Sequence, residues 1–352
     1  MSLKLKPALI IGSGFHRHVL GDTNNANIRP LFDWHYLVEQ VAFEMQVAIP
    51  DKVLSPIQRW ETLITRASIE GYFNSKSITI AGGLHQPCLI EKEARRRLNS
   101  ILAYSSKKYP ISTRSNIPLD ECWGAVISLN FDTAWLTEQN TLLASYPNSD
   151  IYTKQAVNWT GKEQRRLTFN HLIAGLKDGN YRRLWFPNGS CCHPETIRMG
   201  LHDYGSAPFA IKSAYTRLKI WERETGITEK HPALQSNQIY SPLRLASEGK
   251  PNLDEFTDSN NTIPLSWVTE FLYRPIVFAG VGLSNEETGL WWLLSQRARN
   301  LSRKGIPNNV HILLKDTDRT EFWRSRPFGI KPIFCSNWDA GWEEILTIKY
   351  DI

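Results

Sequence analysis

The sequence lacks the features of metal-stapled, disulfide-rich and secreted proteins. Its five cysteines are scattered and include no Cys-x-x-Cys pair, which argues against a zinc ribbon and against a disulfide framework. The apolar run at residues 8–11 leads straight into a glycine turn and is too short for a signal peptide or a membrane span. We therefore expect a cytoplasmic protein that folds without a structural metal.

The chain also lacks a strong bias of charge. Lysine and arginine number 41 against 35 aspartates and glutamates, so the formal net charge is +6. This mildly basic balance suits an anionic ligand or a nucleic acid, and it does not choose between them. A chain of 352 residues can bury roughly three quarters of its unfolded surface, which is enough for a stable core. We interpret residues 1–352 as a single domain.

The sequence does contain a regular alternation of strand and helix patterns. Strands are predicted at residues 8–11, 125–131, 150–154, 184–186, 275–280, 310–314 and 331–335. Helices are predicted at residues 33–47, 55–69, 91–104, 132–143, 162–176, 213–224, 286–302 and 339–345. This alternation predicts an α/β, Rossmann-like fold with a mainly parallel sheet and helices on both faces. We expect residues 35–120 to form a helical insertion beside the sheet, and residues 226–261 a long surface segment.

Glycines or polar side chains follow four of the predicted strands. Because ligands of parallel sheets bind beyond the carboxyl ends of the strands, we expect these segments to meet at one crevice. The first, Gly12-Ser13-Gly14-Phe15, can offer backbone N–H groups to a phosphate; the alternative is a plain turn. The second, Asn130-x-Asp132, places an amide and a carboxylate on the same side of the chain; the alternative is that Asp132 only caps the next helix.

The other two segments follow later strands. Asn188-Gly189 could bring a further amide to the crevice, and the alternative is an ordinary β-turn, in which Asn-Gly is favoured. Gly280-Val281-Gly282-Leu283-Ser284 could hold a ribose or a phosphate, and the alternative is helix capping without a ligand. Downstream basic residues are expected on a solvated helix face, with a nucleic-acid contact as the alternative. They are Arg297, Arg299, Arg303 and Lys304.

The order of these motifs resembles the sirtuin-like fold, and within it the NAD-cleaving domains of bacterial anti-phage effectors. Gly12-Ser13-Gly14 resembles the family's Gly-Ala-Gly turn, and Trp34 is similar to a tryptophan that follows it in these effectors. Asn130-x-Asp132 resembles the family's Thr-x-Asn-x-Asp, and residues 280–284 its C-terminal Gly-x-Ser-Leu-Ser/Asp stretch. Ser336-Asn337 is similar to a late turn near the adenine. The resemblance covers residues 8–345.

This resemblance implies an NAD⁺ hydrolase that releases nicotinamide and ADP-ribose without a metal. Asn130 would orient the ribose or a water, and Asp132 would hold the nicotinamide amide. The turns at residues 12–15 and 280–284 would hold the phosphates and the adenosine, with Asn337 near the adenine. The resemblance also implies an antiviral, abortive-infection role in the cytoplasm. Because such an enzyme must be restrained, we expect a separate sensor or activator chain, or homo-oligomerisation, to control it.

The sequence departs from the family at two places. It lacks the four-cysteine zinc module of sirtuin deacylases, which argues against deacylation. The family's catalytic His-Gly pair aligns with Asn188-Gly189, and asparagine cannot act as a general base. His193 and His171 are the other histidines that could substitute. Two alternatives therefore stay open: a regulatory subunit that binds NAD or ADP-ribose without cleaving it, and a nucleic-acid-associated subunit of a defence complex.

Overall fold

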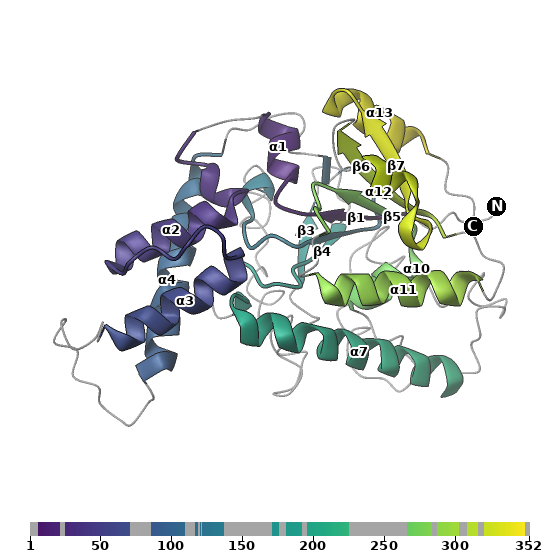
Figure 1. Cartoon of the computed structure of the whole chain (residues 1–352). Helices are drawn as coiled ribbons and strands as arrows, with labels where there is room; N and C mark the ends of the chain where they lie inside the picture. Colours follow the sequence, from purple (N-terminus) through teal and green to yellow (C-terminus); the bar gives the residue numbers. More distant parts are fainter. Residues whose placement is uncertain are drawn as a thin grey trace.

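The structure, a computed structural model, is built around one seven-stranded sheet (Figure 1). It describes residues 6–21, 25–70, 86–109, 117–118, 120, 122–136, 171–175, 181–191, 196–224, 266–283, 287–302, 308–315 and 320–348. The strands are β1 (Ala8–Ile11), β2 (Ala125–Ser128), β3 (His171–Gly175), β4 (Tyr181–Trp185), β5 (Ile276–Ala279), β6 (Val310–Lys315) and β7 (Lys331–Cys335). Their order is β3-β4-β2-β1-β5-β6-β7. Six of them run parallel, and β3 pairs antiparallel with β4 at one edge, which confirms the predicted mainly parallel sheet.

Helices pack on both faces of the sheet, as predicted, because alternate strand residues point to opposite sides. In β1, Leu9 and Ile11 belong to one hydrophobic core, and Ala8 and Ile10 belong to the other. The first core is shared with α1 (Phe15–Leu20), α2 (Trp34–Met45), α3 (Pro56–Ile69), α4 (Gln86–Lys107) and α13 (Trp338–Thr347). The second is shared with α7 (Leu201–Glu224), α10 (Trp267–Tyr273), α11 (Thr288–Ser302) and α12 (Thr320–Arg324).

The segment predicted as a helical insertion contains three long helices. Helices α2, α3 and α4 pack against one another, and Figure 1 shows them as a group at one end of the sheet. The sequence marks where they begin: Asp33 caps α2 by accepting a hydrogen bond from the Tyr36 amide, at 3.0 Å. Ser55 and Gln58 form a capping box at the start of α3. No helix among the described residues is long and apolar enough to cross a membrane.

Several predicted elements differ from those observed. Strand β4 begins at Tyr181 rather than at residue 184, and helix α4 spans Gln86–Lys107 rather than residues 91–104. The helix predicted at residues 162–176 is wrong at its end, because residues 171–175 form the edge strand β3. A short apolar run of this kind fits either state, and pairing with β4 decides it. Helix α7 begins twelve residues before the predicted start at residue 213, despite Gly205 and Pro208. Strand β2 ends at Ser128 rather than at residue 131. Residues 137–143, 150–154 and 226–261 lie outside the described residues.

Arg297 corrects the expectation of a solvated basic face. Its side chain is buried and donates hydrogen bonds to the carbonyl oxygens of Phe271 and Leu272, at 2.6 and 2.8 Å, and to Asn308 Oδ1, at 2.9 Å. It therefore ties α11 to the end of α10, where the last carbonyl groups of that helix need donors. Arg299 is exposed, as predicted, and residues 303–304 lie outside the described residues.

Candidate functional site

The order of the strands creates one position where a ligand is expected. The chain runs from β1 to β2 and β4 on one side, and it later runs through β5, β6 and β7 on the other side of β1. The connections therefore diverge at the carboxyl end of β1, which is the topological switch point where α/β sheets bind ligands. A cavity of about 530 Å³ lies there. This volume is within the range of small-molecule pockets, roughly 300–1,000 Å³.

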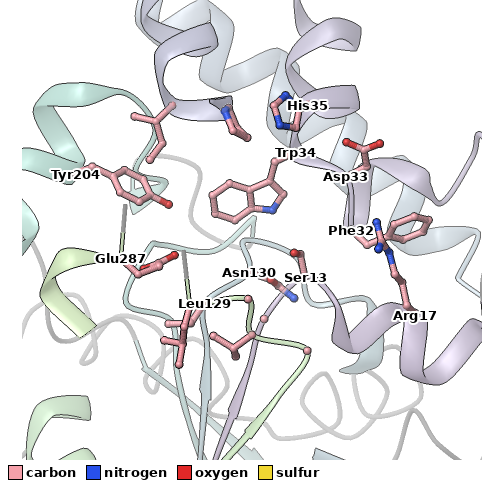
Figure 2. Close-up of a pocket in the computed structure, with 17 residues that line it drawn as sticks. Ser13, Arg17, Phe32, Asp33, Trp34, His35, Leu129, Asn130, Tyr204 and Glu287 are labelled. Atoms are coloured by element: carbon pink, nitrogen blue, oxygen red, sulfur yellow. The ribbon is translucent and has the colours of Figure 1, made fainter. Parts of the chain in front are cut away.

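The cavity is lined by residues from both helical layers and from three strand ends. Gly12 and Ser13 follow β1, Leu129 and Asn130 follow β2, and residues 280–283 follow β5. The remaining lining residues are Arg17, Phe32, Asp33, Trp34, His35, Pro56, Ile57, Tyr204 and Glu287. Figure 2 shows the Trp34 indole above Ser13 and Asn130, with Tyr204 and Glu287 on one side and Asp33 and Arg17 on the other. The structure therefore brings three of the four predicted segments to one cavity.

The first and fourth segments contain glycines for a structural reason. The amide of Gly14 donates a hydrogen bond to the carbonyl oxygen of Gly280, at 2.9 Å. A Cβ atom at Gly12 would lie 2.6 Å from the same carbonyl, and one at Gly280 would overlap the amide of Phe15. Close packing of one turn on the other therefore requires these glycines whether or not a phosphate binds. Gly282 differs, since its Cβ would meet nothing within 4 Å.

Several predicted contact residues lie away from the cavity. Phe15 is buried and packs edge-on against Trp342, with ring centroids 6.1 Å apart, so it belongs to the core. Asn337 is exposed and caps α13 by accepting a hydrogen bond from the Ala340 amide at 2.9 Å. It is not among the residues that line the cavity.

Leu283 of the fourth segment does line the cavity, where it is buried and has a left-handed backbone with φ of 45°. Ser284 lies outside the described residues.

Asn130 is the most informative residue of the site. Its side chain is 1% exposed, and among the described residues neither Oδ1 nor Nδ2 has a hydrogen-bond partner. Leaving a buried polar group without a partner costs about 1–3 kcal/mol. Because Asn130 lines the cavity, a ligand that both donates and accepts hydrogen bonds would satisfy this amide. Beside it, the Trp34 ring stacks on Phe131, with centroids 4.9 Å apart.

Asp132, by contrast, is occupied inside the protein. Its Oδ2 lies 3.0 Å from His16 Nε2, and its Oδ1 accepts a hydrogen bond from the Ala134 amide at 3.0 Å, at the start of the 3-10 helix η4 (Ala134–Leu136). His16 Nδ1 lies 3.0 Å from the Tyr109 hydroxyl. Burial and the Asp132 charge raise the pKa of Tyr109 well above its usual value, so Tyr109 stays a neutral donor. Asp132 thus caps a helix and holds a buried chain of hydrogen bonds, and it does not line the cavity.

Asn188 lies beside the larger cavity rather than in its lining. Its side-chain Nδ2 donates a hydrogen bond to the backbone carbonyl of Leu129 at 2.9 Å, and its backbone carbonyl accepts one from the backbone amide of Arg198 at 2.9 Å. It lines an adjoining cavity of about 40 Å³, which shares Leu129, Tyr204 and Glu287 with the larger one. Asn188 therefore joins two strand ends and has no acid–base function to offer.

The wall of the cavity formed by α1 and the start of α2 carries charged groups that are not among the predicted site residues. Asp33 is partly buried, which tends to raise its pKa, but the Tyr36 amide and the Arg29 guanidinium outweigh burial and lower it. The Arg17 guanidinium lies 5.7 Å from the centre of the Phe32 ring. His35 is the one histidine among the described residues that lines the larger cavity, and its Nδ1 accepts from Arg59 at 3.2 Å. His193 lies outside the described residues.

Two further lining residues, Tyr204 and Glu287, come from the helical layer opposite α2. Tyr204 lies in the part of α7 that the sequence pattern did not predict as helix, and Glu287 directly precedes α11. Tyr204 does not follow a predicted strand, and Glu287 comes at the end of the fourth segment, where the sequence pattern indicates only the polar start of a helix. The starts of the predicted helices do point to Asp33 and Glu287, since acidic side chains are favoured there.

No family model and no curated protein matches the chain.

Proposed function

We propose that the larger cavity binds NAD⁺ and that the chain hydrolyses it to nicotinamide and ADP-ribose. The observation that carries the proposal is the buried amide of Asn130, which lines the cavity without a partner among the described residues. It lies where the motif resemblance expects the residue that orients the ribose. The position at the switch point of a parallel sheet and the volume of the cavity support a dinucleotide ligand.

In this proposal, three parts of the cavity contact three parts of NAD⁺. The diphosphate lies against the turn at Gly12 and Ser13, where Arg17 supplies a positive charge. The nicotinamide ribose lies beside Asn130, under the Trp34 indole. Gly282 leaves room for the adenosine ribose, because its missing side chain opens onto space. No metal is needed, since nicotinamide leaves as a neutral molecule and its leaving nitrogen requires no Lewis acid.

Asn188 favours a second candidate, a regulatory subunit that binds NAD⁺ or ADP-ribose without cleaving it. The family resemblance places the catalytic histidine at this position, and the amide found there donates to the Leu129 carbonyl. An amide does not titrate near neutral pH, so a mechanism that depends on a base at residue 188 would be lost. The two candidates share the binding site and differ only in turnover.

Calorimetric titration of NAD⁺ and measurement of nicotinamide release together test both candidates. We expect the unmodified chain to bind NAD⁺ and Asn130→Ala to weaken binding by about tenfold or more, because a buried hydrogen bond pair is lost. Nicotinamide release by the unmodified chain supports the hydrolase. Release only after Asn188→His supports the regulatory subunit. No binding by either protein refutes both candidates.

We further propose that the chain acts as an NAD-depleting effector of anti-phage defence, controlled by a sensor chain or by homo-oligomerisation. The reason is chemical: unrestrained hydrolysis would drain a cofactor that every cell needs. Light scattering combined with the same nicotinamide assay tests this idea. A monomer that hydrolyses NAD⁺ at full rate without any partner would refute it.

A further inference from the structure

Hydrolysis of NAD⁺ places a specific demand on the site, and this inference rests on the hydrolase function proposed above. When the bond between C1′ of the ribose and the pyridinium nitrogen breaks, its electron pair neutralises the positive ring, so the leaving group needs no acid. The ribose becomes a cation of oxocarbenium type, which a carboxylate stabilises, as in glycoside hydrolysis. The water that attacks C1′ must then lose a proton to a base. One carboxylate beside a water-sized space can meet both needs.

Two carboxylates line the larger cavity, Asp33 and Glu287, and of these only Glu287 also lines the adjoining smaller cavity. Asp33 Oδ1 accepts the Tyr36 amide at 3.0 Å, and Asp33 Oδ2 accepts two hydrogen bonds from the Arg29 guanidinium, at 3.0 and 2.8 Å. Asp33 is therefore used to begin α2 and to pair with a cation. Figure 2 shows it across the cavity from Glu287, beyond the Trp34 indole.

Glu287 lies on the boundary between the two cavities. It lines both the larger cavity and the adjoining cavity of about 40 Å³. It directly precedes α11, and its carbonyl accepts the first hydrogen bond of that helix from the Trp291 amide at 3.0 Å, so its backbone is fixed. The smaller cavity is large enough for about three water molecules. Its other polar lining residues are Asn188, Tyr204, Arg198 and Asp203, and Asp203 forms an ion pair with Arg95 at 2.7 Å. Glu287 thus joins the proposed ribose site to a space for water.

We propose that Glu287 is the catalytic carboxylate of this site and that it acts in place of the family's histidine. The C1′–N bond breaks and its electrons remain on nicotinamide, while the ionised Glu287 stabilises the ribosyl cation. A water from the smaller cavity forms the new C1′–O bond, and its proton passes to Glu287 and then to solvent. One NAD⁺ and one water give nicotinamide, ADP-ribose and one proton. Asn188 holds the Leu129 carbonyl beside this route and takes no proton.

Glu287→Gln tests this assignment, because it keeps the shape of the side chain and removes the charge. We expect the dissociation constant for NAD⁺ to change by less than about threefold. We expect nicotinamide release to fall by about 100-fold or more, the usual effect of losing a general base. The matched control is Glu321→Gln, which removes an exposed carboxylate in α12 and should leave release unchanged. Sodium formate added to Glu287→Ala should restore part of the rate by supplying a carboxylate.

Each outcome separates this inference from the proposed function. Unchanged release by Glu287→Gln overturns the catalytic role while the hydrolase stands. Loss of NAD⁺ binding by a variant whose melting is unchanged also overturns it, because Glu287 would then be a binding residue. An unmodified chain that binds NAD⁺ without releasing nicotinamide refutes the hydrolase and this role together. An unmodified chain that does not bind NAD⁺ refutes the site itself.

Discussion

Residues that look alike in the sequence have different tasks in the structure. Asn130 and Asp132 are two positions apart and both are 1% exposed, but only Asn130 lines the cavity. The side chain of Asp132 turns to His16 and to the start of η4. The sequence places both residues at a strand end, and it cannot show that a histidine more than 100 positions away will occupy the carboxylate. For this reason the position of Asn130 at the cavity could be anticipated, and for Asp132 the contacts favour the alternative that it holds the start of the next helix.

Asp132→Asn distinguishes the two interpretations of this residue. With Asp132 as acceptor, His16 Nε2 and the Ala134 amide both donate to it, and an asparagine amide must turn its NH₂ group toward one of them. We expect the free energy of unfolding to fall by about 1–3 kcal/mol. NAD⁺ affinity should stay within about threefold, because the side chain does not line the cavity. Urea unfolding and calorimetry check these values.

The control is Glu343→Gln in α13, an exposed carboxylate in the middle of the helix whose loss should change stability by less than about 0.5 kcal/mol. A variant at residue 132 that keeps full stability and loses NAD⁺ binding would show that the family-based role is correct. The crevice would then have to include the carboxylate, contrary to the lining of the cavity.

At the scale of elements, the turns after β1 and β5 act as one unit. Gly280 has a φ of 64°, and its carbonyl accepts the Gly14 amide. We expect Gly280→Ala to lower the free energy of unfolding by about 2 kcal/mol or more, since the new Cβ overlaps the Phe15 amide and the backbone is left-handed. Chemical denaturation measures the change.

Gly282→Ala, two residues along the same turn, is the control. No atom lies within 4 Å of its added Cβ, so its stability should change by less than about 0.5 kcal/mol. Equal stability of the two variants would contradict the close packing of the turns.

The elements themselves could be predicted where local pattern decides them. Short apolar runs gave strands β1, β5, β6 and β7 within a residue of their observed bounds, and capping residues marked the start of α2 and α3. Pattern failed where tertiary contacts decide. Strand β3 exists because it pairs with β4, and the first half of α7 persists through Pro208 while it packs between α3 and α11. Because Tyr204 lies in that half, one wall of the site was hidden with it.

At the scale of the whole molecule, the cavity depends on layers that meet only after folding. Strand ends supply its floor, α2 and α3 supply one wall, and α7 with the residue before α11 supplies the other. The sequence could indicate the floor, because parallel strands share one carboxyl edge. It could not indicate the walls, because the residues of one wall, at positions 34–57, are more than 100 positions from Tyr204 of the other. The catalytic assignment of Glu287 therefore needed the assembled fold.

When the chain unfolds as one unit, the protonation of a single buried histidine affects the free energy of unfolding of the whole molecule. His311 lies in β6 between two strands, opposite Lys331 of β7. Burial, together with the charge of Lys331, lowers the pKa of His311 from 6.5 to about 4. The unfolded chain therefore binds a proton between these values and the native chain does not. The contribution of His311 to stability is therefore full above pH 6.5 and is lost as the pH drops toward 4.

We expect the free energy of unfolding to decrease by about 2 kcal/mol between pH 7.5 and pH 5 on account of this residue, since each pH unit below 6.5 costs about 1.4 kcal/mol. His311→Gln should remove that part of the pH dependence, as urea unfolding at the two pH values will show. The control is His202→Gln, whose side chain is 88% exposed, and this variant should keep the dependence. If His311→Gln and the unmodified chain lose the same stability at pH 5, His311 accepts its proton in the native state, and the sheet around β6 must then be open to water.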